Sequence, residues 1–92
     1  MWERKDGSNV MSDDGGRSVH LNIGLCFIDY NEGSRTVRIS IERVSNPRRI
    51  VIYPETAKNW PERTTVPSDG IQRIISEVCE CMDVLECPYE CA

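Results

Sequence analysis

The stretch VHLNIGLCFIDYNEGSRTVRISIE, residues 19–42, decides the fold of this chain. Its first half alternates at a period of two, which places on one face of a strand Val19, Leu21, Ile23, Leu25 and Phe27. Asn-Glu-Gly-Ser at 31–34 has the composition of a turn, and residues 37–42 alternate again between apolar and polar side chains. The pattern predicts a β-hairpin in which strand 19–30 pairs with strand 37–42.

Two further segments extend this sheet. Residues 49–53 form a short apolar run that ends at Pro54, because proline lacks the N–H donor that a strand ladder needs. Residues 54–68 contain three prolines and predict a long connection, in which residues 64–66 add an edge strand and Trp60 anchors the connection to the core. The expected sheet is therefore an antiparallel β-meander of three or four strands.

A helix is predicted over residues 69–86, where apolar side chains recur at the spacing of one helical face: Ile71, Ile74, Ile75, Val78, Met82 and Leu85. The other face carries four charged residues that are expected to point to water: Arg73, Glu77, Glu80 and Asp83. This amphipathic helix, packed on one face of the meander, gives an α+β fold. Its predicted core consists of Leu21, Ile23, Leu25, Phe27, Val37, Ile39, Ile41, Ile74, Ile75 and Val78.

The first 18 residues are rich in glycine, serine and aspartate, and they offer as apolar anchors only Trp2, Val10 and Met11. Such a segment buries too little apolar surface to offset the entropy of ordering it. We expect a flexible N-terminal arm at 1–18 and a single α+β domain at 19–92. Met11 is an alternative start, so residues 1–10 could lie outside the translated protein.

Several function classes find no support in the sequence. No apolar run approaches the roughly 18 residues of a membrane helix, and residues 1–16 contain no secretory segment. The chain has one histidine, His20, and no phosphate loop, paired-carboxylate motif or nucleotide fingerprint. We therefore expect a cytoplasmic binding protein and no enzyme, with no cofactor, no small-molecule substrate and no membrane partner.

Charge is sorted along the chain. Residues 35–63 carry seven bases and three acids, whereas residues 69–92 carry six acids and one base. Such asymmetry concerns partners more than the fold, and the planar arginine fork suits phosphate as well as carboxylate. The predicted partner or nucleic-acid surface is Arg35, Arg38, Arg48, Arg49 and Lys58, with Asn22 and His20 as polar neighbours. The alternative is a solvated strand face on which Glu42 pairs with Arg38 or Arg35.

Four cysteines lie close together near the C-terminus: Cys79, Cys81, Cys87 and Cys91. Four thiolates could hold zinc or an iron–sulfur cluster, but Cys79 and Cys81 lie about 200° apart around a helix and no C-x2-C knuckle is present. We expect free thiols and no metal. On oxidation the sequence offers two disulfides, Cys87 with Cys91 or Cys81 with Cys87.

The segments HLNI (20–23), YNEGS (30–34) and RISIERV (38–44) resemble the small phage-encoded anti-CRISPR proteins, in particular the inhibitors of the type I-F (Csy) surveillance complex. The length and acidity of the chain are similar to those of that group. The resemblance implies a stoichiometric inhibitor that binds Cas subunits and the guide RNA backbone in a bacterial host cell and blocks target DNA binding or hybridisation. It assigns no functional residue by position.

Two alternatives stay open. The first is a free-standing small RNA- or DNA-binding module, in which three strands and a helix present the arginines to phosphates. The second is a small cysteine-based metal-binding domain.

Overall fold

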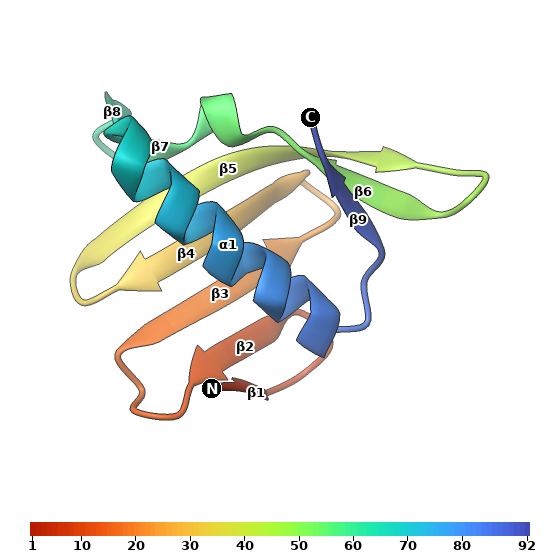
Figure 1. Cartoon of the computed structure of the whole chain (residues 1–92), viewed down its shortest axis with the longest axis horizontal. Coiled ribbons are helices and arrows are strands. Elements are labelled where there is room, and N and C mark those ends of the chain that lie inside the picture. The colour runs from red at the N-terminus through yellow and green to blue at the C-terminus, as the bar shows by residue number, and fades with distance from the viewer.

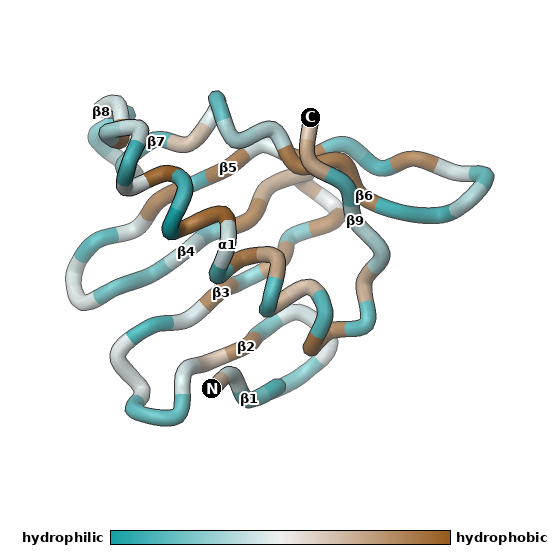
Figure 2. The backbone as a smooth tube through the Cα atoms, viewed as in Figure 1, coloured by the Kyte–Doolittle hydropathy of each residue, from teal (hydrophilic) through white to brown (hydrophobic).

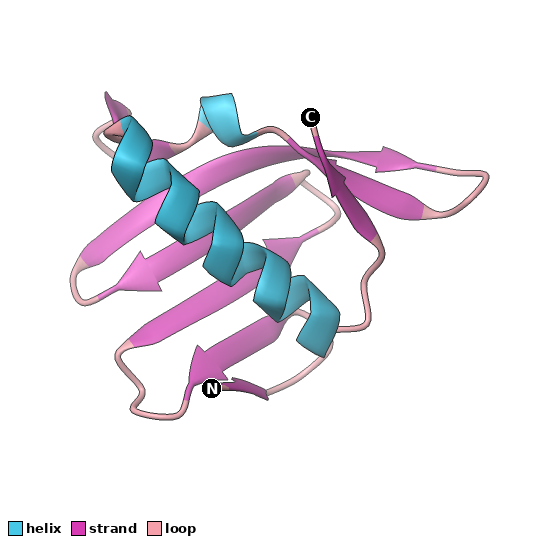
Figure 3. Ribbon diagram, viewed as in Figure 1, coloured by secondary structure: helices cyan, strands magenta, loops and turns pink.

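The computed structural model describes residues 1–92 and shows a nine-stranded sheet, curled into a half-barrel, with one α-helix across one of its faces (Figures 1 and 3). The strands are β1 Trp2–Arg4, β2 Asn9–Ser12, β3 Arg17–Asn22, β4 Phe27–Glu32, β5 Arg35–Val44, β6 Arg49–Ile52, β7 Lys58–Trp60, β8 Thr64–Thr65 and β9 Tyr89–Cys91. A 3-10 turn, η1, spans Pro54–Thr56, and the helix α1 spans Ser68–Val84. The predicted meander of three or four strands is wrong, because short strands at both ends of the chain complete a larger sheet.

Along the sheet the strand order is β1-β2-β3-β4-β5-β6-β9, and β7 pairs with β5 and with β8. All pairs are antiparallel except β6 with β9. The ten-residue strand β5 is the centre of the sheet, since it pairs with β4 on one edge and with both β7 and β6 on the other. The pairing with β4 stops at Ser40, so the β5–β6 hairpin extends past the end of β4 (Figure 1).

The strand predicted over residues 19–30 is two strands, β3 and β4, joined by a tight turn at residues 23–26. Asn22 forms this turn, because its side-chain Oδ1 accepts the N–H of Leu25 at 2.9 Å. Cys26 follows in the left-handed region with a φ of 61°. The turn shifts the alternation, so Ile28 and Tyr30 point inward, whereas Leu25 is 73% exposed and Phe27 lies on the other face. The predicted core positions Leu25 and Phe27 are therefore wrong.

Residues 1–18 differ from the predicted flexible arm. They form β1 and β2 and begin β3, and Val10 and Val19 pair directly across β2 and β3 with no exposed surface. The order comes from partners distant in sequence: Trp2 lies beside Arg17, whose guanidinium carbon is 5.0 Å from the ring centroid. Composition alone does not contain these contacts.

The core lies between the sheet and α1. Its largest fully buried side chains are Tyr30, Ile28, Ile39, Ile52, Ile74 and Met82. Figure 2 shows brown apolar segments alternating with teal polar ones along the strands and along α1, as expected for elements that bury one face each. The only α-helix of the chain lacks the length and the apolar composition of a membrane span.

Candidate binding surfaces on the sheet

One face of the sheet is covered by α1, and the opposite face, the open face, carries a row of polar side chains. Cross-strand pairing sets this row: His20 pairs with Asp29, Asp29 with Arg38, and Arg38 with Lys58. The row ends on β2 at Asn9, whose Oδ1 lies 3.0 Å from Nδ1 of His20. Three of the predicted surface residues, His20, Arg38 and Lys58, therefore share one face.

Arg38 is the centre of an alternating stack on the open face. Its guanidinium carbon lies 3.9 Å from the ring centroid of Phe27 and 4.3 Å from that of Trp60, which are its diagonal neighbours on β4 and β7. Nε and Nη2 of Arg38 donate to the two carboxylate oxygens of Asp29 at 2.8 and 3.0 Å. This bidentate bond raises the pKa of Arg38 and fixes the plane of its guanidinium.

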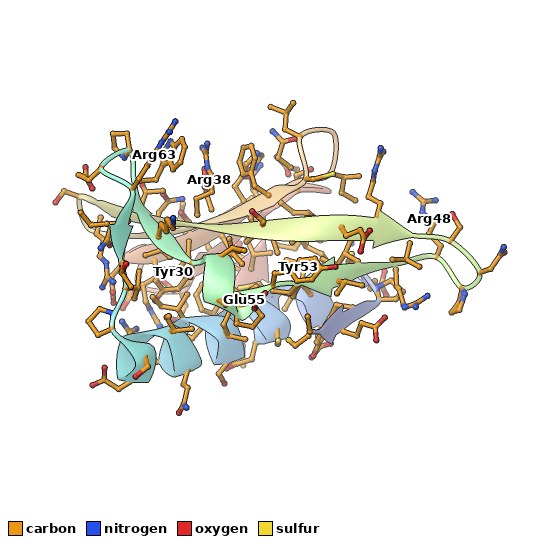
Figure 4. All side chains as sticks on the ribbon, turned by 90° about the horizontal axis from the view of Figure 1, so that it is seen from above. Tyr30, Arg38, Arg48, Tyr53, Glu55 and Arg63 are labelled. Carbon is orange, nitrogen blue, oxygen red and sulfur yellow. The ribbon has the colours of Figure 1, made fainter.

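Arg63 extends the stack by one member. Its guanidinium carbon lies 4.8 Å from the ring centroid of Trp60, and its backbone N–H donates to the carbonyl of Asn59 at 2.6 Å. Figure 4 shows Arg38 and Arg63 projecting from the sheet on the side away from α1. We call Phe27, Arg38, Trp60 and Arg63 the open-face stack; together with Lys58 it lines a shallow hollow of about 650 Å³.

The second surface is the projecting β5–β6 hairpin, the basic hairpin, which carries Arg43, Arg48 and Arg49. Arg43 and Arg48 are exposed, and Figure 4 shows Arg48 at the end of the molecule far from Arg38. Arg49 is held within the chain, because Nε donates to Glu90 on β9 at 2.6 Å and Nη1 donates to the carbonyl of Pro47 at 2.9 Å. Of the predicted pair Arg48 and Arg49, only Arg48 is free for a partner.

A groove of about 810 Å³ lies beside the basic hairpin. Its apolar lining includes Leu21, Ile23, Ile50 and Leu85. Its charged lining consists of Arg43, Arg48, Arg49 and Glu86. Ile23 belongs to the same β3–β4 turn that lines the open-face hollow with Leu25. Both hollows therefore border this turn.

The remaining two predicted residues, Arg35 and Asn22, bond to other residues of the chain and belong to neither surface. Arg35 lies at the start of β5, where Nε donates to Oδ1 of Asn59 at 2.9 Å. Asn22 is a turn-forming residue, as described above. The seven predicted residues thus divide among the open face, the basic hairpin and local structure, and they do not form one continuous patch.

The predicted exposure of Glu77 on α1 is wrong. It was expected to face water, but it is 8% exposed and lies between α1 and the sheet. Arg17 donates Nη1 to its Oε1, and Arg73 and Tyr30 donate to its Oε2 at 2.9 and 3.2 Å. Arg73 also bonds to Glu32 at 3.1 Å, and burial raises the pKa of the Tyr30 hydroxyl, which keeps it protonated as a donor. This network fastens the helix to β3 and β4, and Figure 4 shows Tyr30 between the two layers.

Sequence reasoning missed the open-face stack. Phe27 and Trp60 were assigned to the core, and Arg63 had no role beyond its charge. Phe27 and Trp60 are more than 30 positions apart in the sequence. Only the pairing of β7 with β5 brings Trp60 to Arg38. One available signal was Trp60 itself, a large aromatic residue that lies between the basic residues Lys58 and Arg63 in the sequence.

All five cysteines are free thiols, and the four near the C-terminus lie in three different settings. Cys81 is buried in the core, Cys87 lies half-buried after α1, and Cys79 faces Cys91 of β9 with a distance of 3.9 Å between the two sulfurs. No group of three or more His, Cys, Asp or Glu side chains is arranged to hold a metal ion. Burial raises the pKa of Cys81 to about 12 and that of Cys79 to about 11.

Oxidation is expected to join Cys79 to Cys91. It is not expected to form either pair suggested by the sequence, Cys87 with Cys91 or Cys81 with Cys87. With oxidised glutathione, one thiolate forms a mixed disulfide and the other displaces glutathione from it. Because Cys79 has a raised pKa, its thiolate fraction rises tenfold per pH unit below about 11, so we expect the bond to form faster at pH 9 than at pH 7. The closed loop should stabilise the protein by about 3 kcal/mol.

Peptide mapping by mass spectrometry checks the pairing. Cys91→Ser should abolish the bond, whereas Cys87→Ser should leave it intact. A Cys87 to Cys91 linkage in the wild-type protein would contradict the structure.

No family model, curated protein or solved structure matches this chain.

Proposed function

We propose that this protein is a stoichiometric inhibitor of the anti-CRISPR kind, which binds a type I-F surveillance complex and keeps target DNA from binding to it or pairing with the guide RNA. It works in the cytoplasm of a bacterial host cell, by occupancy and without chemical turnover. Residues 20–44, which carry the resemblance to that family, form β3, β4 and β5. These strands contribute to both candidate surfaces.

The observation that carries the proposal is the division of the cations into two groups. Six arginines already bond to acceptors within the chain, namely Arg4, Arg17, Arg35, Arg38, Arg49 and Arg73. Four exposed cations take part in none of the ion pairs of the chain: Arg43, Arg48, Lys58 and Arg63. All four lie in the basic segment 35–63, and they are available to the phosphates of a guide RNA.

The helix supports the same role from the opposite side. Asp69, Glu80 and Asp83 are exposed on α1, and none of them takes part in an ion pair. Carboxylates of this kind suit the lysine- and arginine-lined surfaces with which a Cas subunit holds DNA. The unpaired charges of α1 are carboxylates alone, whereas all the unpaired cations lie on the sheet side, beside the exposed carboxylates Glu42, Glu55 and Glu62. Such a body can contact RNA and protein in the same complex.

The test uses purified, guide-loaded type I-F complex and a labelled target duplex. Wild-type protein should lower target binding in proportion to its molar ratio to the complex. The double variant Arg43→Glu, Arg48→Glu should inhibit at least about tenfold more weakly, which corresponds to about 1.4 kcal/mol of lost binding energy. Arg49 is left unchanged, because its guanidinium already holds Glu90.

Arg4→Glu with Lys5→Glu is the matched control, since it makes the same change in net charge on β1 and the turn that follows it, outside the basic segment. If the loaded complex ignores the wild-type protein at micromolar concentration, the proposal fails. Strong, salt-sensitive retention of naked duplex in a gel shift, without the complex, would instead favour a free-standing nucleic-acid-binding module.

A further inference from the structure

We propose that the open-face stack binds an unpaired nucleotide of a single-stranded nucleic acid, with the base on the indole of Trp60 and the flanking phosphates on Lys58 and Arg63. The inference deepens the proposed function, on which its biological role rests, by naming an exposed single-stranded segment as the ligand of this site. It uses residues that the basic hairpin does not contain.

The inner part of the stack is already assembled. Arg38 lies between Phe27 and Trp60, and Asp29 neutralises its charge through two hydrogen bonds. The guanidinium of Arg38 therefore acts as a positioning group that holds the indole of Trp60 by one face. The other face of the indole is left to the exposed Arg63 or to a ligand. A rigid, preformed aromatic surface lowers the ordering cost of binding.

The outer member of the stack can be exchanged. Arg63 is exposed and has no ion pair in the chain, and its guanidinium carbon lies 4.8 Å from the ring centroid of Trp60. An arginine over an exposed ring contributes on the order of 0.5–1 kcal/mol, whereas a stacked base contributes about 1–3 kcal/mol. A base can thus replace the guanidinium on the indole, and the released guanidinium can bind the adjoining phosphate.

The ring faces decide between a nucleotide and an acidic peptide. The face of an aromatic ring carries the negative part of its quadrupole, which repels a carboxylate, but a neutral flat base stacks on it. Lys58 lies on the same strand as Trp60, two residues earlier, so its ammonium group is on the same side of the sheet. Two rings, Phe27 and Trp60, and two unpaired cations, Lys58 and Arg63, therefore line one hollow of about 650 Å³, a size typical of small-ligand sites, in which Glu55 is the one carboxylate of the lining.

The test uses the variant Trp2→Phe, in which Trp60 is the only tryptophan and a ring is kept beside Arg17. A ten-nucleotide oligouridine should quench the indole fluorescence with a Kd on the order of 10–100 µM. Two phosphate contacts on a single strand predict a slope of log K against log salt of about −1.4, and Lys58→Gln should reduce it to about −0.7. For variants that lack the indole, the anisotropy of labelled oligouridine measures binding. Trp60→Ala should bind about 5- to 100-fold more weakly than the wild-type protein, and Trp60→Phe should recover part of the loss.

Two probes isolate the stacking step. An abasic oligonucleotide of the same length keeps the phosphates and should bind at least fivefold more weakly, and polyglutamate should not quench. Equal binding of the abasic or polyglutamate probe, or no quenching by oligouridine up to about 1 mM, would overturn the inference. If Trp60→Ala does not fold, the abasic probe and Lys58→Gln on the intact stack decide the question.

This test contains no surveillance complex, so its result is separate from that of the inhibition assay. A wild-type protein that inhibits the complex but does not bind oligouridine would contradict only the stack. A protein that binds oligouridine but leaves the complex active would contradict only the inhibitor.

Discussion

Removal of residues 1–10 is expected to lower the free energy of unfolding by about 2–4 kcal/mol, a large part of the roughly 5–14 kcal/mol available to a domain of this size. The truncation removes β1 and the fully buried side chain of Val10. It also removes the bond from the N–H of Leu21 to the carbonyl of Ser8 at 2.8 Å, and it exposes the edge of β3. Urea denaturation followed by circular dichroism measures the change.

Two point variants on the same strand provide the control. Val10→Ala removes a fully buried side chain and should cost about 2 kcal/mol, whereas Met11→Ala on the open face should cost less than about 1 kcal/mol. A flexible arm predicts no loss of stability in any of the three proteins. A truncated chain as stable as the full one would therefore show that β1 and β2 do not contribute to the fold.

Glu77→Ala is expected to destabilise the protein by about 2–3 kcal/mol. The carboxylate accepts from Arg17, Arg73 and Tyr30 in a setting where its side chain is 10% exposed. Its loss leaves two guanidiniums and a buried hydroxyl without their shared acceptor. The cost stays below that of a fully buried pair, because the side chains of Arg17 and Arg73 are 31% and 48% exposed and can regain water.

Glu80→Ala, one turn away on the exposed face of α1, is the matched control and should change stability by less than about 0.5 kcal/mol. Glu77→Gln tests the charge, since it keeps one acceptor oxygen and should recover part of the loss. Thermal and urea unfolding of the three variants measure the effect. Equal stability of Glu77→Ala and Glu80→Ala would mean that the network does not hold the helix to the sheet.

The local part of the fold could be predicted from the sequence, and the number of strands could not. The turn at 31–34 is correct: Gly33 takes a φ of 61°, and Glu32 pairs with Arg35 across a two-residue loop. The helix predicted for 69–86 runs over Ser68–Val84. β1, β7 and β9 are only three residues long, too short for a periodic signal, and they exist because neighbouring strands satisfy their backbone groups. The edge strand predicted over residues 64–66 is present as β8, Thr64–Thr65.

The candidate surfaces divide in the same way. The exposed cations of segment 35–63 could be found by counting charges, and Arg48 and Lys58 are exposed as expected. The partners that neutralise Arg38 and Arg49 could not be found, because Asp29 and Glu90 reach them through strand pairing. Which arginines are free for a partner is therefore a property of the register, and charge counts do not contain it.

The amino-acid order by itself determined the alternating strands of the central hairpin, the apolar stripe of the helix and the separation of basic from acidic segments, since these depend on residues a few positions apart. Tertiary structure alone decided that the N-terminal residues become strands, that Glu77 is buried, and that Phe27, Arg38, Trp60 and Arg63 stack. Each of these depends on contacts between residues distant in the chain, whose energy appears only when the sheet has closed around its core.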